Sequence, residues 1–205
     1  AHAWRACSKA NIREWTPDKY NKDNVIQDCS ASVTRALEID PDDPEAHRIM
    51  GAIKLEKREF SPARYHHEKA KELCPSDAYI IARYATLLIY LGEPENALKE
   101  IKQAKRIDPF CPDILFEDEG MCYYWLENFQ TAIESFNKLK VPTRNSLFYL
   151  AASLVNSGDS QKASETLNQA LAMTQLTIEK FIETQKYQDA DRNLVLRTSL
   201  EGIAA

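Results

Sequence analysis

Residues 44–111 decide the fold, because they divide into two blocks of the same length. Residues 44–77 read PEAHRIMGAIKLEKREFSPARYHHEKAKELCPSD, and residues 78–111 read AYIIARYATLLIYLGEPENALKEIKQAKRIDPFC. Small residues recur in three phased series along the chain: Gly51, Ala85, Gly120 and Ala151; Ala63, Ala97, Ala132 and Ala163; and Ala36, Ala70, Ala104 and Ala170, with Leu139 before the last. A period of about 34 residues fits two helices of three to four turns joined by tight turns, so the sequence predicts a helical repeat.

The glycines fit this repeat. Gly51 and Gly120 lie inside predicted helices, where glycine costs about 1 kcal/mol relative to alanine. A neighbouring helix is therefore expected to cross close to the backbone at both positions. Gly92 and Gly158 are expected to end the first helix of their repeats in the left-handed conformation, and Asn128 is expected to do the same.

Proline positions predict helix starts. Asp43-Pro44 and Ser61-Pro62 each read as an N-cap residue followed by proline at the first helical position. Other prolines fall between the predicted repeats, at Pro41, Pro75, Pro109 and Pro142, and no proline falls inside a predicted helix.

The chain resembles a tetratricopeptide repeat array. The resemblance implies one all-α domain over residues 1–205, a right-handed superhelix of antiparallel helix pairs closed by a C-terminal capping helix. The first repeat is imperfect, with a long polar loop at Thr16–Asp23. The expected repeats span about 1–43, 44–77, 78–111, 112–142 and 143–174, followed by a capping segment at 175–205. The side chains expected to pack between helices are Met50, Phe60, Leu73, Tyr84, Leu98, Ile101, Phe129, Phe136, Leu150 and Leu167.

Composition excludes several classes of protein. The 205 residues carry a net charge of −5, which gives no broad basic field for nucleic acid. The longest apolar stretch, near Leu87–Leu91, is far shorter than the roughly 20 residues of a membrane span. We therefore expect a cytoplasmic protein without membrane or nucleic-acid partners. Because the chain has no initiator methionine and opens inside an apparent helix, we also expect a fragment of something longer.

The five cysteines are expected to be reduced and buried rather than paired. They are Cys7, Cys29, Cys74, Cys111 and Cys122, an odd number at wide spacing without a Cys-x-x-Cys pair. Neither a disulfide framework nor a zinc site is predicted from this pattern.

A second resemblance is narrower. The junction Ile107–Asp113 and the tail Phe181–Gly202 look similar to the C-terminal repeat region of bacterial class III adenylate/guanylate cyclases. The tail departs from that family at Gln188–Arg192, which lacks the family's proline, and at Glu201–Ile203. Related tails also follow winged-helix DNA-binding domains. The tail helix, Gln188–Leu200, also has a simpler interpretation as a cap on the last repeat.

No motif in the sequence predicts catalysis, a metal site or a cofactor. His66 and His67 are adjacent on a helix and point about 100° apart, and His67 falls where the repeat places a buried aromatic residue. The acidic run Glu117–Glu119 lies on a helix and is expected to form a solvated face. Gly-rich phosphate loops, nucleophile elbows and His-Glu-x-x-His motifs do not occur.

A partner-binding groove is the better prediction. In tetratricopeptide arrays the first helix of each repeat lines the concave face, and the resemblance carries this role to Arg48, Tyr79, Tyr90, Met121, Tyr124, Trp125 and Phe148. Exposed aromatic residues in such number indicate an interface. The alternative is that the C-terminal helices fold back and bury these residues. A chaperone-type carboxylate clamp is disfavoured, because only Arg48 supplies a cation at a clamp position and Glu117 is acidic.

The sequence therefore predicts a non-catalytic interaction module that binds a protein or peptide, with self-association as a further possibility. More specifically, we interpret the module first as the C-terminal regulatory part of a bacterial adenylate/guanylate cyclase. The alternatives are the repeat domain of a winged-helix transcription regulator and a free-standing assembly scaffold.

Overall fold

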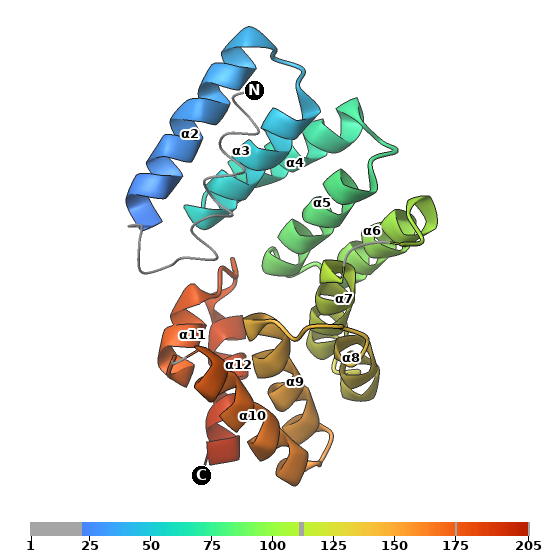
Figure 1. Cartoon of the computed structure of the whole chain (residues 1–205), viewed down its shortest axis with the longest axis vertical. Helices are drawn as coiled ribbons and strands as arrows, with labels where there is room; N and C mark the ends of the chain where they lie inside the picture. Colours follow the sequence, from blue (N-terminus) through green and yellow to red (C-terminus); the bar gives the residue numbers. More distant parts are fainter. Residues whose placement is uncertain (1–21, 111–112, 175, 205) are drawn as a thin grey trace. The chain divides into compact units, whose positions relative to one another are not determined.

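The computed structural model describes residues 22–110, 113–174 and 176–204, which form eleven α-helices and no strand (Figure 1). The all-α prediction is confirmed. The chain divides into two compact units, an N-terminal unit of residues 1–87 and a C-terminal unit of residues 88–205, with α5 crossing the boundary. The helices are α2 Lys22–Ile39, α3 Pro44–Glu56, α4 Phe60–Leu73, α5 Ala78–Tyr90, α6 Pro94–Ile107, α7 Ile114–Trp125, α8 Phe129–Phe136, α9 Arg144–Asn156, α10 Ser160–Thr174, α11 Ile178–Thr184 and α12 Ala190–Ala204.

In the N-terminal unit, α3 packs against both α2 and α4. Its core joins the inner faces of α2 and α3 through Cys29, Val33, Ala36, Ala46, Ile49, Met50 and Ile53. The predicted loop at Thr16–Asp23 is wrong at its end, since Lys22 and Asp23 already belong to α2, and its other residues lie outside the described part.

The predicted N-cap at Asp43 is confirmed. Its carboxylate accepts from the backbone N–H groups of Glu45 and Ala46, at 2.9 and 3.1 Å, and Pro44 occupies the first turn of α3. Ser61, in contrast, is not a cap: α4 begins at Phe60, and the residue before it, Glu59, makes no capping hydrogen bond with its side chain.

Asp43→Ala is expected to lower the free energy of unfolding of the N-terminal unit by about 1 kcal/mol, because two backbone donors lose their acceptor. Asp42→Ala is the matched control, since this neighbouring side chain is exposed and should change stability by less than about 0.5 kcal/mol. Urea unfolding followed by circular dichroism measures both. Equal stability of the two variants would contradict the capping role.

In the C-terminal unit, α7 pairs with α8 and α9 pairs with α10. The two short connections within these pairs make each pair antiparallel. After α10, the chain turns back, and α12 packs against α9 and α10 while α11 packs against α12 (Figure 1). Residues 176–204, which carry these two helices, are called the C-terminal segment below.

The phased small residues lie where helices cross. All members of the series but Leu139 are buried, and the close approach predicted at Gly51 and Gly120 is confirmed. A Cβ at Gly51 would lie 2.5 Å from the His67 ring, and one at Gly120 would lie 2.6 Å from the Phe136 ring. His67 and Phe136 are thus repeat equivalents, each with its ring on the glycine of the preceding helix. None of the side chains predicted to pack between helices is exposed.

The turns that follow α3, α5, α7 and α9 have the same geometry. In each, the second residue after the helix has positive φ, and the N–H of the next residue donates to a carbonyl five residues back, as in a Schellman motif. Gly92 (φ +84°) and Gly158 (φ +93°) do this as predicted. The prediction for Asn128 is wrong by one residue: Glu127 has φ +57°, and Asn128 is the N-cap of α8, accepting from the Thr131 N–H. Arg58 (φ +57°) takes the corresponding place after α3.

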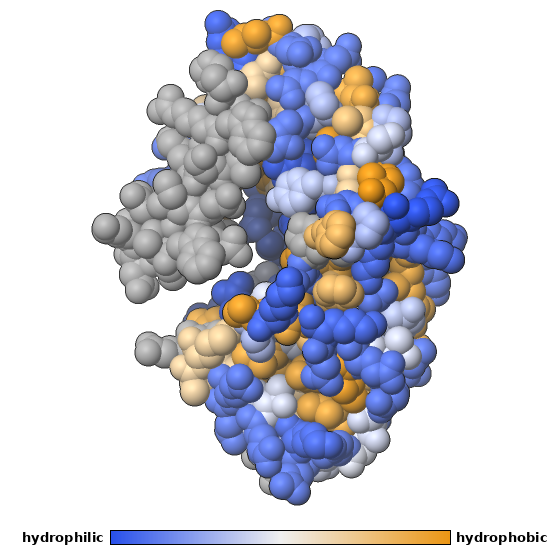
Figure 2. Space-filling view, turned by 45° about the vertical axis from the view of Figure 1, so that its right-hand side comes forward, coloured by the Kyte–Doolittle hydropathy of each residue, from blue (hydrophilic) through white to orange (hydrophobic). Residues whose placement is uncertain are grey.

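On the face drawn in Figure 2, hydrophobic residues lie in separate groups among hydrophilic ones. The exposed large apolar side chains of the described residues include Phe110, Leu194 and Val195, but of the predicted groove only Tyr79. None of the described helices is long and apolar enough to span a membrane.

Candidate functional site

The aromatic residues predicted to line the groove of the C-terminal unit are mostly buried. Tyr90, Met121, Tyr124 and Phe148 expose between 0% and 6% of their surface, and Trp125 is half-buried. With Tyr149 of α9, which is fully buried, these residues form the surface that is called the aromatic groove below. Their expected exposure is therefore wrong. The alternative left open from the sequence describes the arrangement, because the C-terminal segment contacts Tyr90, Tyr124, Trp125 and Phe148.

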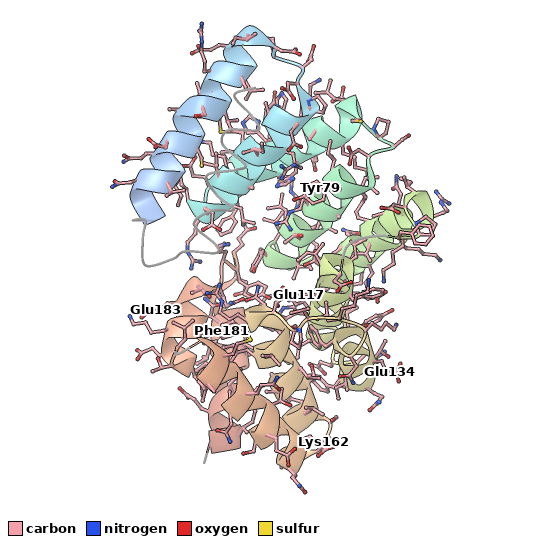
Figure 3. All side chains as sticks on the ribbon, in the orientation of Figure 1. Tyr79, Glu117, Glu134, Lys162, Phe181 and Glu183 are labelled. Carbon is pink, nitrogen blue, oxygen red and sulfur yellow. The ribbon has the colours of Figure 1, made fainter. Side chains whose placement is uncertain are left out.

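Phe181 of α11 is the first contact of the C-terminal segment with the groove. Its ring stacks on Phe148 of α9, with ring centroids 3.9 Å apart and an interplanar angle of 13°, and it meets Tyr149 edge-on. Figure 3 marks the position of Phe181 on α11. Both phenylalanine rings are fully buried, so this stack is a hydrophobic anchor.

Tyr187 is the second contact, and it is polar. The indole Nε1–H of Trp125 donates to the Tyr187 hydroxyl at 2.7 Å, and that hydroxyl lies 2.5 Å from the hydroxyl of Tyr149. Tyr149 donates to Oε1 of Gln185 at 3.3 Å, so Tyr187 is the donor to Tyr149. The four groups therefore form one directional chain of hydrogen bonds that ties two groove residues to two residues of the C-terminal segment.

Burial keeps the two tyrosines of this hydrogen-bond chain protonated. Removal from water raises the pKa of both Tyr149 and Tyr187 well above the ordinary value for a phenol. Both phenols consequently stay neutral at physiological pH and act as hydrogen-bond donors. Neither is a candidate general base, because the anionic form is strongly disfavoured.

Arg192, in the first turn of α12, is the third contact. Its guanidinium lies over the Trp125 ring, with Cζ 4.6 Å from the centroid, and Nη2 donates to the Gly92 carbonyl at 3.3 Å. Just before it, the Gln188 N–H donates to the Tyr90 carbonyl at 2.9 Å. The end of α5 and the turn after it thus bind the C-terminal segment through backbone carbonyls.

The rest of α12 continues along α9. Leu196 and Leu200 are fully buried, and the Ser199 hydroxyl accepts from the Tyr124 hydroxyl at 3.2 Å and from the Asn156 amide at 3.1 Å. The buried leucines are consistent with the simpler interpretation of the tail as a cap. A cap does not require the polar contacts, which join the Ser199 hydroxyl to Tyr124 and Asn156.

The N-terminal unit holds the other two predicted groove residues. Arg48 is only 5% exposed, and its guanidinium makes two bonds to the Glu45 carboxylate, at 2.5 and 2.7 Å. Its Cζ lies 4.9 Å from the Tyr79 ring centroid, and Tyr79 itself is 46% exposed. A partner carboxylate would have to compete with Glu45 for this cation, which agrees with the expectation that a carboxylate clamp is disfavoured.

His67 occupies the aromatic position of its repeat, as predicted. It is 2% exposed between Gly51 and Tyr84, and burial, followed by the charges of Arg83 and Arg48, lowers its pKa to about 3. His66 points elsewhere and meets His47, with the two Nδ1 atoms 2.9 Å apart. No signal in the sequence marks this pair, because the two residues lie on different helices. Among the described residues, no group of three or more His, Cys, Asp or Glu side chains is placed to hold a metal.

The acidic run Glu117–Glu119 is not a solvated face, and that prediction is wrong. Glu117, which is labelled in Figure 3, and Asp118 are 4% and 2% exposed. Thr143, the N-cap of α9, donates a short hydrogen bond to Glu117. Glu119 pairs with Lys105 of α6 at 2.9 Å. These carboxylates therefore connect helices α6, α7 and α9.

The three cysteines among the described residues are free. Cys29 and Cys122 are buried as predicted, while Cys74 is half-buried. Burial and the neighbouring Asp118 raise the pKa of the Cys122 thiol, so it stays protonated. Cys7 and Cys111 lie outside the described residues.

Sequence reasoning missed four residues that hold the groove together: Tyr149, Gln185, Tyr187 and Arg192. Tyr149 directly follows Phe148, and the groove positions that the resemblance carries over include Phe148 but not Tyr149. The other three lie outside the repeat, where the pattern carries no positional information. The available signal was the pair Phe181 and Tyr187, the two aromatic residues of the tail 176–204.

No protein-family model matches the chain, and no curated protein is similar to it in sequence. Solved structures share the fold. PilW, a widely conserved type IV pilus biogenesis factor, matches with a TM-score of 0.69 at 18% identity, over 94% of this chain and 89% of its own. TTC0263, a thermophilic TPR protein of Thermus thermophilus, matches with a TM-score of 0.68 at 18% identity, over 95% and 100%. YrrB, a TPR protein with an unusual peptide-binding site, matches with a TM-score of 0.54 at 19% identity, over 80% of this chain and 82% of its own. The tetratricopeptide repeat fold is thus confirmed.

Proposed function

We propose that the chain is a non-catalytic protein-interaction module and that the aromatic groove of the C-terminal unit is its binding site for a protein segment. One observation carries this proposal: the groove already binds a segment outside the repeats, the chain's own residues 176–204. An aromatic stack, a chain of hydrogen bonds and an arginine over an indole hold that segment. Trp, Tyr and Arg are the residues that supply most binding energy at interfaces.

The mode of binding follows from these contacts. Tetratricopeptide helices present a rigid surface, and the bound segment contacts it through α11, through α12 and through the non-helical connection 185–189, which carries Tyr187. An external segment would bind by displacing the C-terminal segment. YrrB, which shares the fold, is described as having a peptide-binding site, so peptide binding is the activity to test first.

The more specific proposal is that the array regulates an adenylate/guanylate cyclase domain in the same protein. Its support is the sequence resemblance at Ile107–Asp113 and Phe181–Gly202. Because Phe181, Tyr187 and Arg192 fall within the second stretch, the segment that resembles the cyclases is the one that occupies the groove. Conversion of ATP to cyclic AMP by the full-length gene product tests this proposal. A winged-helix output domain or a free-standing scaffold remains the alternative.

Exchange of the C-terminal segment tests the groove. A specific protease site is inserted in the connection after α10, at residues 175–177, and the purified chain is cut there. A fluorescently labelled peptide of residues 176–204 is then added in excess. We expect saturable binding by anisotropy, because cutting removes the high effective concentration, about millimolar, that a short connection gives the attached segment. A peptide of the same composition in scrambled order is the control.

The helical circular dichroism of the cut chain shows whether it stays folded. Failure of the labelled peptide to bind a folded, cut chain would overturn the proposed site. Loss of the helical signal on cutting would do so too, since it would show that the segment is core and not a ligand.

A further inference from the structure

We propose that the aromatic groove recognises protein segments that carry a tyrosine followed five residues later by an arginine. This inference rests on the proposed function and names the class of partner. The C-terminal segment supplies these groups as Tyr187 and Arg192, with Phe181 six residues before the tyrosine. An external partner is expected to present the same three anchors.

The groove demands a phenol, and an apolar ring does not replace it. Trp125 Nε1 and the Tyr149 hydroxyl both converge on the Tyr187 oxygen, at 2.7 and 2.5 Å. Tyr149 and Tyr187 are 0% and 2% exposed, so water does not reach their hydroxyl groups freely. A phenylalanine in the place of Tyr187 would leave the indole N–H without its acceptor and Tyr149 without a donor, and buried unpaired groups are costly.

The groove also demands a planar cation. The Gly92 carbonyl and the Trp125 ring face offer one acceptor and one π surface to the same guanidinium. A Cβ at Gly92 would lie 3.4 Å from Arg192 Nε, which is van der Waals contact. Stacking on the indole while donating to a carbonyl fits a flat guanidinium better than the point charge of lysine.

The resident segment is an imperfect ligand, which leaves room for a competitor. Among the buried side-chain atoms of the described residues, Arg192 Nη1 and Asn193 Oδ1 have no hydrogen-bond partner. Each such atom weakens the hold of the segment on the groove. A partner segment whose arginine makes all of its hydrogen bonds would bind the groove more tightly than the resident segment does.

The test uses the cut chain and labelled peptides of residues 176–204. Compared with the native peptide, Tyr187→Phe and Arg192→Lys are each expected to weaken binding by about tenfold, as losing one buried hydrogen-bonding group does. Val195→Ala is the matched control, because that side chain is 53% exposed, and its affinity should stay within about twofold.

A foreign peptide separates recognition of the anchors from recognition of the whole segment. It keeps residues 181–192, because the connection 185–189 between α11 and α12 is not helical, and its flanking residues are replaced by alanine, glutamate and lysine. We expect it to displace the labelled native peptide, and the same peptide with phenylalanine for tyrosine to require about tenfold more. If the native peptide binds but Tyr187→Phe and Arg192→Lys bind equally well, this inference fails while the proposed function stands. If the foreign peptide never competes, the inference fails as well. If no peptide binds, the proposed function fails first.

Discussion

Replacing Gly120 with alanine is expected to lower the free energy of unfolding of the C-terminal unit by about 2 kcal/mol, although alanine is the better helix former. The reason is the Phe136 ring of α8, whose atoms would lie 2.6–2.8 Å from the new Cβ. Phe136 is 3% exposed, so the ring cannot swing into solvent, and α7 and α8 must move apart. Chemical denaturation followed by helical circular dichroism measures the loss.

The matched control is Gly202→Ala in α12. No atom lies within 4 Å of a Cβ there, and the residue is exposed. This change should raise stability, by up to about 1 kcal/mol, since alanine loses less backbone entropy than glycine in a helix. A double variant, Gly120→Ala with Phe136→Leu, should recover part of the loss, because the smaller side chain relieves the clash. Gly120→Ala as stable as the native chain would contradict the close crossing.

This expectation shows how much of the fold lies in the sequence. A glycine in mid-helix is unfavourable alone, so its recurrence in phase with alanines predicts where the helices cross. The turns were predictable where glycine marks them, at Gly92 and Gly158. At Glu127 the predicted position was wrong by one residue, and at Arg58 no turn was predicted. Both residues adopt positive φ, and neither residue type signals that conformation.

The site was less predictable, for a physical reason. The resemblance to tetratricopeptide arrays assigned Tyr90, Tyr124, Trp125 and Phe148 to one face of the repeats, and all four contact the C-terminal segment. Whether that face meets solvent depends on where residues 176–204 lie, and these residues are outside the repeat. The prediction of a solvated face at Glu117–Glu119 was wrong for the same reason. Glu117 accepts a hydrogen bond from Thr143, which lies 26 positions away in the chain.

The second large effect is acid sensitivity at His67. The unfolded chain titrates this imidazole near its ordinary value of 6.5, whereas in the folded N-terminal unit its pKa is about 3. Above pH 6.5 the ring is neutral in both states and stability is complete. Between pH 6.5 and about 3 only the unfolded state takes up the proton, so stability falls as the pH falls, by about 1.4 kcal/mol per pH unit and by up to about 5 kcal/mol in all.

Denaturation midpoints measured from pH 7 to pH 4 test this expectation, with His67→Phe as the key variant. Phenylalanine already occupies the equivalent position of another repeat, since Phe136 packs on Gly120 as His67 packs on Gly51. The variant removes the titration, and it also removes the His67 Nδ1 atom, which is buried without a hydrogen-bond partner. We therefore expect it to be at least as stable as the native chain at pH 7 and to lose far less stability by pH 4.

His66 provides the comparison within the same helix. Burial and the neighbouring His47 lower its pKa to about 4, but its side chain is only half-buried, so solvent weakens the effect. His66→Gln should consequently leave most of the acid sensitivity in place, while His67→Phe removes most of it. The reverse order would show that the His47–His66 pair, and not the ring packed on Gly51, makes the N-terminal unit sensitive to acid.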